Sequence, residues 1–368
     1  MKKLAYCFST TLCALMFCLG LLCTSCAEPA PPAVDLSSFD SANCYIVSEA
    51  GFYKFKPVKG NSSESVGEVA SASVLWETFG TDTAPNVGDL VKEVSYKEGY
   101  IEFKTADTFS EGNAVIAAKD ANENILWSWH IWLTDQPEGQ VYKNDAGTMM
   151  DRNLGATSAT PGDVGALGLL YQWGRKDPFL GSASISEAVD AQSTITWPSA
   201  VISTVTTGTI AYAIANPTTF ITYDCSNYDW YFTDSSSTDN TRWTESSSAK
   251  SIYDPCPSGW RVPDGGRKGV WVKARGSRAA FKFAYDRVNE GMNFSGKFSL
   301  DSTVWYPAAG FRASGQGSLH YIGSNAVYWS ASYTRYFGYF LSFEDDGRVV
   351  LSYDGNRASG RSVRCIKE

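Results

Sequence analysis

Cysteines and histidines can bind metal ions or carry out redox chemistry when they are suitably spaced in the sequence. The chain has 368 residues and nine cysteines, and five of the cysteines lie within residues 1–26. The other four are Cys44, Cys225, Cys256 and Cys365. No two of these four have the C-x-x-C spacing of a metal or redox motif, and His130 and His320 are the only histidines. The sequence therefore predicts no metal site and no cofactor.

Residues that could catalyse a reaction do not occur in a recognisable pattern. The sequence has no G-x-S-x-G, H-E-x-x-H or G-x-x-x-x-G-K-[ST] segment. The stretch GRKGV, residues 266–270, lacks the spacing of a phosphate-binding loop and is expected to be a surface turn. Paired carboxylates for glycoside cleavage stay open, because the chain has 39 Asp and Glu residues and their separations are invisible in sequence. We expect no catalytic residue.

The segment YDPCPSGWRVP sets Cys256 between two prolines. Prolines fix their own backbone angles and bias the preceding residues toward extended conformations, so the cysteine is presented on a stiff arm. Its natural partner is Cys365, which lies on a predicted terminal strand that would otherwise fray. A disulfide closing a loop of about 110 residues could stabilise the fold by about 4 to 5 kcal/mol. Cys44 and Cys225 could pair with each other or stay as thiols.

The N-terminus has the layout of an export signal. In residues 1–25, two lysines precede a long apolar run that ends in small residues. The segment CTSC resembles the bacterial lipoprotein pattern Leu-x-x-Cys, with Cys23 where leucine is usual, so Cys26 is the predicted lipidation site. An uncleaved membrane anchor is the alternative. Residues 26–38 are rich in proline and predict an extended tether.

The charge of the chain argues against nucleic acid as a partner. The formal net charge of -8 becomes -10 once Lys2 and Lys3 leave with the signal, which contains no acidic residue. Such a protein repels phosphates, and no cluster of Lys and Arg offsets this.

Residues 39–138 predict short strands separated by turns. CYIV and YKFKPV, YIEFKT, and the pair NAVIAA and ILWSWHIWL are strand patterns. In the last of these, alternate residues from Trp127 to Leu133 share one face. An antiparallel, immunoglobulin-like β-sandwich fits this pattern. His130, on the other face, is expected to be an ordinary hydrogen-bonded residue.

The turn-forming stretch DQPEGQ predicts a boundary, after which residues 139–368 form a second domain. Within it, residues 181–250 are rich in Ser, Thr and Ala and are expected to be long, solvated loops. The last third returns to strands, and YFLSFEDDGRVVLSYDGN predicts a hairpin with an Asp-Gly turn. The residues expected to face one another across this hairpin are Tyr339, Leu341, Phe343, Val349, Leu351 and Tyr353.

Six motifs occur in an order that resembles the Fibrobacter succinogenes major paralogous domain: MMDRNLGA, GLLYQWGRKDP, YDPCPSGWRVP, PAAGFR, YWSAS and GRSVRCIKE. The resemblance covers about residues 142–368. Upstream, SANCYIV, EGNAVIAAKD and ILWSWHIWLTD look like the N-terminal region of surface lipoproteins of Bacteroides and relatives, some described as fimbrillin-like. The resemblance implies an exported, lipid-anchored outer-membrane protein. We expect it to face the cell exterior, and the periplasmic face is the alternative, because Glu28 is the only acidic residue in the segment CAEPAPP. It also implies a second domain of the C-type-lectin-like α+β fold, and it implies no activity.

The chain departs from the family pattern after Pro263. Family members commonly continue with a Thr and a Glu-Trp that open a helix, whereas DGGRKGVW follows here. Two adjacent glycines weaken the expectation of a helix. Trp271 is the candidate for the place of the family tryptophan.

A lectin-like relation makes a sugar ligand the first hypothesis. Calcium-dependent lectins of that fold usually carry Glu-Pro-Asn or Gln-Pro-Asp and a later Trp-Asn-Asp, and residues 142–368 contain none of these. Sugar would then stack on exposed aromatic rings without calcium. The candidate residues are Tyr328, Trp329, Tyr333, Tyr336 and Tyr339. The alternative is that this stretch packs in the core, where aromatic side chains bury large areas.

We therefore expect a cell-surface lipoprotein that is a non-catalytic adhesin, binding a glycan or another protein. The alternative is a structural or accessory subunit of a fimbria-like fibre, which needs a strand edge or groove that accepts another subunit's strand. An enzyme that acts on polysaccharide needs a cleft with carboxylates and has the least support.

Overall fold

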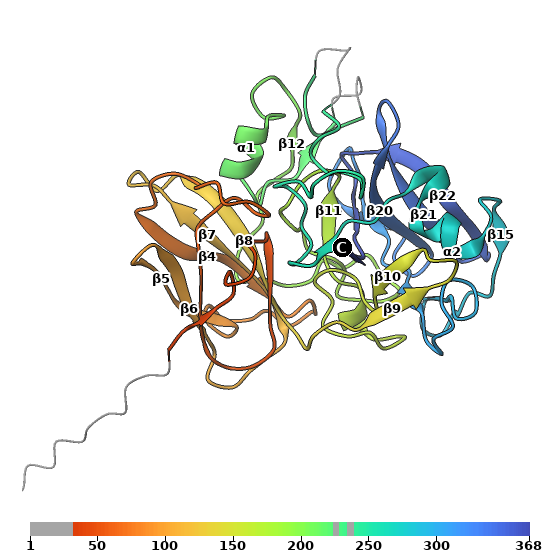
Figure 1. Ribbon diagram of the computed structural model, residues 1–368, viewed down its shortest axis with the longest axis horizontal. Coiled ribbons are helices and arrows are strands. Elements are labelled where there is room, and N and C mark those ends of the chain that lie inside the picture. The colour runs from red at the N-terminus through yellow and green to blue at the C-terminus, as the bar shows by residue number, and fades with distance from the viewer. Residues whose placement is uncertain (1–31, 224–227, 234–238) are drawn as a thin grey trace, which may run out of the picture. The chain divides into compact units, whose positions relative to one another are not determined.

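The computed structural model describes residues 32–223, 228–233 and 239–368 (Figure 1). The predicted export signal, Cys26, residues 27–31 of the predicted tether and Cys225 lie outside the described residues. Val34 and Asp35, also assigned to the tether, instead form a strand that pairs with Tyr53 and Lys54. The structure is mainly β, with 36% strand and 5% helix, which confirms the expected class. Residues Ala33–Glu368 form one compact unit, and the domain boundary near residue 139 stays a prediction. None of the helices in the described ranges is long and apolar enough to cross a membrane.

The N-terminal strands form two four-stranded sheets. These strands are β1 (Val34–Asp35), β2 (Cys44–Val47), β3 (Phe52–Phe55), β4 (Ser71–Thr78), β5 (Val91–Lys97), β6 (Tyr100–Thr105), β7 (Gly112–Lys119) and β8 (Ile125–Leu133). Their orders are β1-β3-β6-β5 and β2-β8-β7-β4. The pairs β1–β3 and β2–β8 are parallel, and the other pairs are antiparallel.

One apolar core joins these two sheets. It contains Phe55 and Phe103 from the first sheet, and Trp127 and Trp129 from the second. The alternation of β8 therefore points Trp127 and Trp129 inward, as expected. Trp132, on the opposite face of β8, is also fully buried, because it belongs to a second core shared with the C-terminal part. The sheet that contains β8 is thus covered on both faces.

The C-terminal part contains the remaining elements. Its strands are β9 (Gly139–Tyr142), β10 (Gly147–Met150), β11 (Leu170–Gln172), β12 (Val201–Ile202), β13 (Ile221–Thr222), β14 (Trp260–Arg261), β15 (Phe281–Lys282), β16 (Gly291–Asn293), β17 (Trp305–Pro307), β18 (Phe311–Arg312), β19 (Leu319–His320), β20 (Asn325–Tyr333), β21 (Phe337–Glu344), β22 (Arg348–Asn356), β23 (Gly360–Ser362) and β24 (Ile366–Lys367). The helices are α1 (Ile210–Ala215), α2 (Val270–Arg275) and the 3-10 turns η1 (Val164–Ala166) and η2 (Gly266–Lys268).

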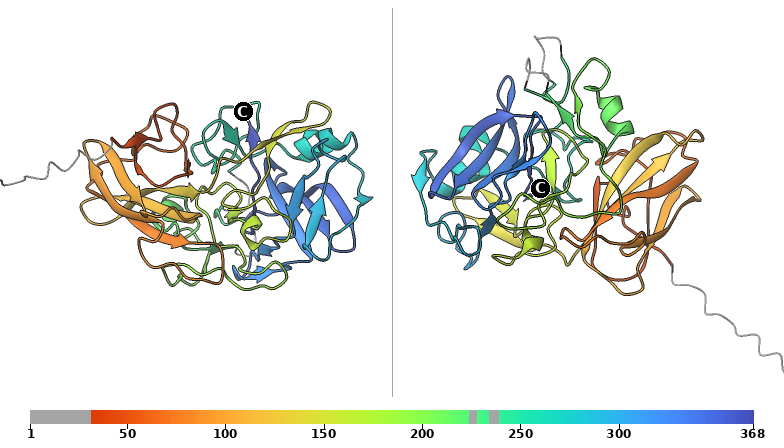
Figure 2. Two further views of the ribbon diagram at one scale, coloured as in Figure 1. Left: turned by 90° about the horizontal axis from the view of Figure 1, so that it is seen from below. Right: turned by 180° about the vertical axis from the view of Figure 1, so that it is seen from behind.

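An eight-stranded sheet organises this part, in the order β15-β22-β21-β20-β23-β18-β19, with β11 paired to β23. Figures 1 and 2 show β20–β22 (blue) and the N-terminal strands (red to orange) on opposite sides of the segments around β11. The predicted hairpin is confirmed as β21 and β22, and Gly347 in its turn has a φ of 87°. Trp271 lies on α2 and is fully buried, so a short helix forms despite the two glycines.

The register of this hairpin differs from the expectation at one end. The pairing shifts between Phe340 and Ser342, where β22 contains an extra residue. Such a bulge moves the following residues of the bulged strand to the other face. Tyr353 therefore lies opposite Phe340 and is exposed, whereas Leu351 is buried.

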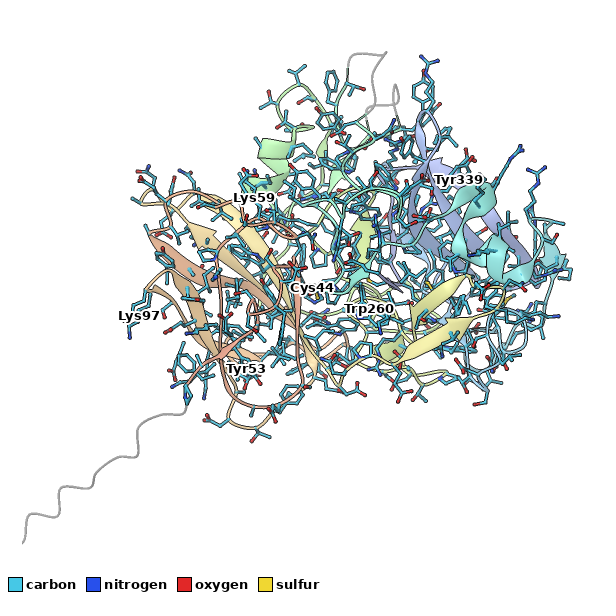
Figure 3. All side chains as sticks on the ribbon, viewed as in Figure 1. Cys44, Tyr53, Lys59, Lys97, Trp260 and Tyr339 are labelled. Atoms are coloured by element: carbon cyan, nitrogen blue, oxygen red, sulfur yellow. A yellow bond between two sulfur atoms is a disulfide. The ribbon has the colours of Figure 1, made fainter. Side chains whose placement is uncertain are left out.

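The disulfide between Cys256 and Cys365 is present, with a Cα–Cα distance of 6.1 Å. Asp254 organises the arm that carries Cys256, because its buried carboxylate accepts hydrogen bonds from the backbone N–H groups of Cys256 and Val262. Burial raises the pKa of this carboxyl group. Cys44 is a buried free thiol (Figure 3), and burial raises its pKa far above the ordinary value, so it is unreactive.

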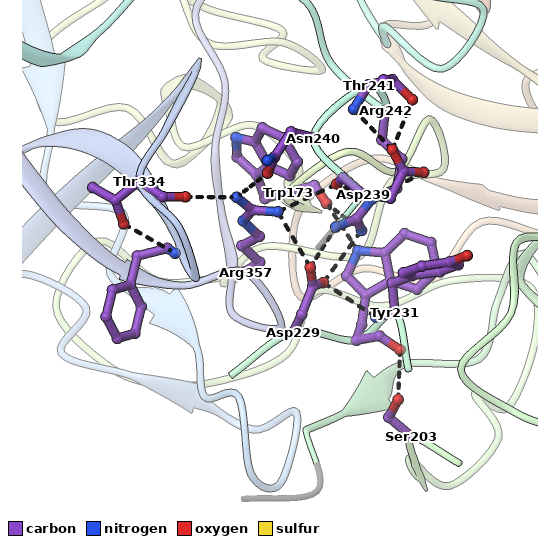
Figure 4. Close-up of polar contacts among 12 residues, drawn as sticks. Trp173, Ser203, Asp229, Tyr231, Asp239, Asn240, Thr241, Arg242, Thr334 and Arg357 are labelled. Carbon is purple, nitrogen blue, oxygen red and sulfur yellow. Dashed lines mark hydrogen bonds and ion pairs between the residues drawn. The ribbon is translucent and has the colours of Figure 1, made fainter. Parts of the chain in front are cut away.

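The Ser/Thr-rich region of residues 181–250 is mostly loop, as expected, but it is not simply solvated. Trp230, Arg242 and Trp243 are fully buried in it. Asp229 bonds Arg242 and also pairs with Arg357, whose Nη1 lies 3.5 Å from a carboxylate oxygen (Figure 4). Both guanidinium groups stack over the ring of Trp173. Buried charges and rings therefore fix this region to the sheet.

Candidate ligand pocket

Tyr328 and Trp329 lie in the core, which corrects the prediction that they could stack on a ligand. β20 is an inner strand of the eight-stranded sheet, so both of its faces are covered and each of these side chains is 0% exposed. The Tyr328 hydroxyl donates to the Pro307 carbonyl at 2.7 Å. Trp329 Nε1 donates to the Tyr171 carbonyl at 2.9 Å. Packing in the core, the alternative for this stretch, holds for these two residues.

The other three predicted aromatic residues are more accessible. Tyr333 is 42% exposed and packs edge-on against Trp173, with the ring centroids 6.1 Å apart. Tyr336 is half-buried. Tyr339 is also half-buried and lies over Gly266 (Figure 3), where a Cβ would stand 3.2 Å from its ring. None of these three lines the pocket described next.

A cavity of about 270 Å³ lies between three loops of the C-terminal part. One loop follows β11, the second leads into β13, and the third connects β18 to β19. Its lining residues are Phe179, Leu180, Asp190, Ala191, Gln192, Ser193, Ile195, Trp197, Pro198, Ala200, Thr218, Phe220, Arg312, Gln316 and Gly317. Much of the lining comes from the region expected to be solvated loop.

The apolar wall of the pocket is built from stacked rings. Phe179 packs against Phe220 at 5.1 Å and against Trp197 at 6.1 Å between centroids. Trp197 also rests on Trp76 of β4, at 5.5 Å, and its Nε1 donates to Ser193 Oγ at 3.0 Å. Because these contacts hold one edge and the N–H of the half-buried indole, the ring is fixed before any ligand arrives.

Arg312, on β18, joins the loop that follows β11 to the loop that connects β18 and β19. Its Nε donates to the Leu180 carbonyl and its Nη1 to the Gly317 carbonyl, both at 2.8 Å. Its Nη2 forms an ion pair with Asp190, whose side chain is 60% exposed. Burial lowers the pKa of Arg312, and the carboxylate partly offsets this. All three donor nitrogens are therefore occupied, and the guanidinium acts as a clamp with its charge balanced.

Arg175 is a buried side chain that supports Phe179 and the segment leading into β13. Its Nη1 donates to the Thr219 carbonyl at 2.8 Å and to Gln172 Oε1 at 2.9 Å. The guanidinium carbon lies 5.0 Å from the centroid of the Phe179 ring. Burial lowers the pKa of Arg175 to about 10, so it stays charged at neutral pH.

The N-terminal sheet also positions the pocket. Gln192 N donates to the Thr81 carbonyl at 2.9 Å, and Thr194 N donates to the Glu77 carbonyl at 3.0 Å. In return, Glu77 N donates to Thr194 Oγ1 at 3.0 Å. The loop that carries Trp197 is thus attached to the edge of β4 by backbone hydrogen bonds, which links the pocket to the N-terminal strands.

His130 and the acidic residues of a second hollow were considered as further sites. Burial lowers the pKa of His130 to about 3, so its imidazole is neutral, and Nε2 pairs with Asn113 Oδ1 at 2.8 Å. A second hollow, of about 380 Å³, contains Glu138, Asp151 and Asp301, but Asp151 is paired with Arg152 at 3.0 Å. Within the ranges that the structure describes, no three Asp, Glu, His or Cys residues are grouped so as to hold a metal ion.

The pocket can hold a small, neutral ligand that has both a flat apolar face and hydroxyl groups. A fixed indole and a phenyl ring offer the stacking surface, while Gln192 and Gln316 add exposed amide groups at the rim. Among its lining residues, Asp190 is the single carboxylate, whereas glycoside cleavage commonly uses two. Comparison with protein-family models, with curated proteins and with solved structures finds no match to this chain.

Proposed function

We propose that this protein is a lipid-anchored, cell-surface binding module that holds a neutral sugar in the pocket formed by Trp197, Phe220 and Arg312, without cleaving it. The observation that carries the proposal is the pre-ordered ring of Trp197 in a pocket whose charged lining residues, Arg312 and Asp190, neutralise each other. Stacking of a pyranose on such a ring requires no reordering of the side chain, which saves the entropy that binding otherwise costs.

The architecture that we propose for it has two parts. The sheets β1-β3-β6-β5 and β2-β8-β7-β4 would form an immunoglobulin-like sandwich, and residues 139–368 would form a C-type-lectin-like domain. The motif order that resembles the Fibrobacter succinogenes major paralogous domain supports this assignment. Lipidation at Cys26 and the proline-rich tether would hold the module at the outer membrane, facing the cell exterior.

One sheet edge, at β5, argues against the fibre-subunit alternative. β5 is an edge strand whose pairing shifts between Lys92 and Ser95, and Glu93 there has a φ of 53°. Lys97 ends the strand (Figure 3). Bulges and charges on an edge oppose the addition of another strand.

A glycan array probed with residues 27–368, with calcium and with a chelator, tests the proposal. We expect binding that survives the chelator, that falls at least tenfold in Trp197→Ala and that is weakened in Gln316→Ala, whose side chain is exposed. Tyr333→Ala, which removes an exposed ring outside the pocket, is the matched control and should bind normally. A blank array, or equal losses in Trp197→Ala and Tyr333→Ala, would overturn the proposal.

A further inference from the structure

Arg361 is a buried cation that has no hydrogen-bond acceptor among the described residues. It lies on β23, its side chain is 7% exposed, and its Nε and Nη1 are enclosed without a partner. No carboxylate forms an ion pair with it in the described part of the chain. Burying a charge without a partner is unfavourable, so this position needs an explanation.

The other buried arginines of the described chain all have acceptors. Arg152, Arg242 and Arg357 pair with aspartates. Arg175 and Arg261 donate to backbone carbonyls, and Arg364 donates to Asn153 Oδ1 at 3.1 Å. Arg361 is the exception in this set, which shows that the fold can supply acceptors for a buried guanidinium and does not supply one here.

Aromatic rings keep Arg361 in place. Its guanidinium carbon lies 4.2 Å from the centroid of Trp329 and 3.8 Å from that of Phe340. Such contacts with ring faces attract a cation but satisfy none of its N–H donors. Desolvation lowers the pKa of Arg361 to about 9, so the group still carries its charge at neutral pH.

Glycine at position 355 lets β22 run close to the guanidinium. A Cβ at Gly355 would stand 2.9 Å from Nη2 of Arg361, which is too close for an ordinary contact, so a side chain here would displace this nitrogen. Tyr353, two residues earlier on β22 and 53% exposed, packs edge-on against Phe340. The half-buried ring of Phe311 lies 5.9 Å from the guanidinium carbon. Of the three guanidinium nitrogens, Nη2 is the one that is not fully enclosed, and flat rings flank the group.

We propose that Arg361 binds the anionic group, a carboxylate or a sulfate, of an acidic sugar at the surface beside Gly355. Guanidinium groups form strong, directional hydrogen bonds with such anions. Nη2, which donates to no acceptor among the described residues, would bind an oxygen of the anion. The rings of Tyr353 and Phe311 would contact the apolar face of the sugar. The bound anion would supply the counter-charge that the fold does not provide.

This site is separate from the neutral pocket. Arg312 pairs with Gly360 across β18 and β23, and a Cβ on Gly360 would point at Arg312 and Phe220, which line the pocket. Because successive residues of a strand point to opposite faces, Phe311 and Arg361 lie on the other face. The two proposals therefore stand or fall independently.

Isothermal titration calorimetry at constant ionic strength tests the site, with sodium glucuronate, glucose 6-sulfate and glucose as probes. We expect at least one of the two anionic probes to bind residues 27–368. Glucose should bind at this site no more than weakly. Comparison of glucuronate with glucose 6-sulfate shows whether the site prefers a carboxylate or a sulfate. Arg361→Gln and Gly355→Ala should each weaken that binding at least tenfold. Gly355→Ala keeps the guanidinium and serves where Arg361→Gln fails to fold.

Arg348→Gln is the matched control. It removes the same charge from an exposed position on β22 and should bind within twofold of the natural chain. Trp197→Ala should likewise leave the anionic probe bound. The proposal is wrong if neither anion binds, if Gly355→Ala binds as tightly as the natural chain, or if Arg348→Gln loses as much affinity as Gly355→Ala.

Discussion

Replacing both cysteines of the disulfide by alanine, Cys256→Ala with Cys365→Ala, should destabilise the protein strongly. The bond joins residues 109 positions apart. It anchors the last strand, β24, which pairs with β10 and β14 through Ile366 and Lys367 alone. Without it, the end of the chain is held by few backbone hydrogen bonds.

The size of the effect follows from the loop length. Closing a loop of this size in the unfolded chain removes entropy equivalent to about 4.8 kcal/mol at 25 °C. Domains are commonly stable by only about 5 to 15 kcal/mol, so the variant should lose a large share of its stability. The denatured state should also expose more surface, since the cross-link no longer restricts it, and the slope of the urea transition should rise.

Urea unfolding with and without reductant measures this effect. Reductant should lower the free energy of unfolding of the natural protein to that of the double variant. It should leave the double variant unchanged, because Cys44 is a free thiol. A loss below about 1 kcal/mol would show that the chain-entropy reasoning fails here, and a response of the double variant to reductant would show that another disulfide matters.

Two further predictions concern buried charge. His130 is neutral in the fold with a pKa of about 3, below the unfolded value of 6.5, so the unfolded state binds the extra proton and stability falls as pH drops below 6.5. From pH 6 to pH 4.5 this group should lower the free energy of unfolding by about 2 kcal/mol. Urea unfolding at several pH values measures this: in His130→Gln the free energy of unfolding should depend less steeply on pH, by the equivalent of about one proton. Asp229→Asn should destabilise the fold by about 3 to 5 kcal/mol, because Arg242 and Arg357 would remain buried beside a neutral amide. A thermal melt that moves by less than 2 °C would contradict this.

Local sequence patterns predicted the elements that depend on local chemistry. The alternation around Trp129 identified β8, the Asp-Gly pair identified the β21–β22 hairpin, and the stiff arm identified the partner of Cys365. Each of these signals acts over a few residues. Cys365 was chosen as the partner of Cys256 because it lies on a terminal strand that would otherwise fray. The sequence could not show that Trp132 would be buried as well, because that depends on a second core contributed by distant residues.

The pocket could not be predicted from the sequence for the same reason. Its lining comes from segments more than 100 residues apart, and Trp197 gains its fixed position from Trp76 and Ser193. The five predicted aromatic residues were chosen from one local run, so they fall on β20, on β21 and between these strands, and not on the pocket lining. The burial of Arg361 was equally unexpected, since arginine is mostly exposed and no local pattern indicates otherwise.

The parallel pairing of β2 with β8 has a mechanical consequence. Four residue pairs, from Cys44 with His130 to Val47 with Leu133, join these strands. The chain enters β2 at its N-terminal end and leaves β8 at its C-terminal end, which are opposite ends of the pair. A pull between tether and ligand would therefore load this ladder in shear, and its hydrogen bonds would have to break together. An antiparallel first strand would instead peel open bond by bond. If the protein is the anchored binding module proposed above, this pairing would resist the load between anchor and ligand.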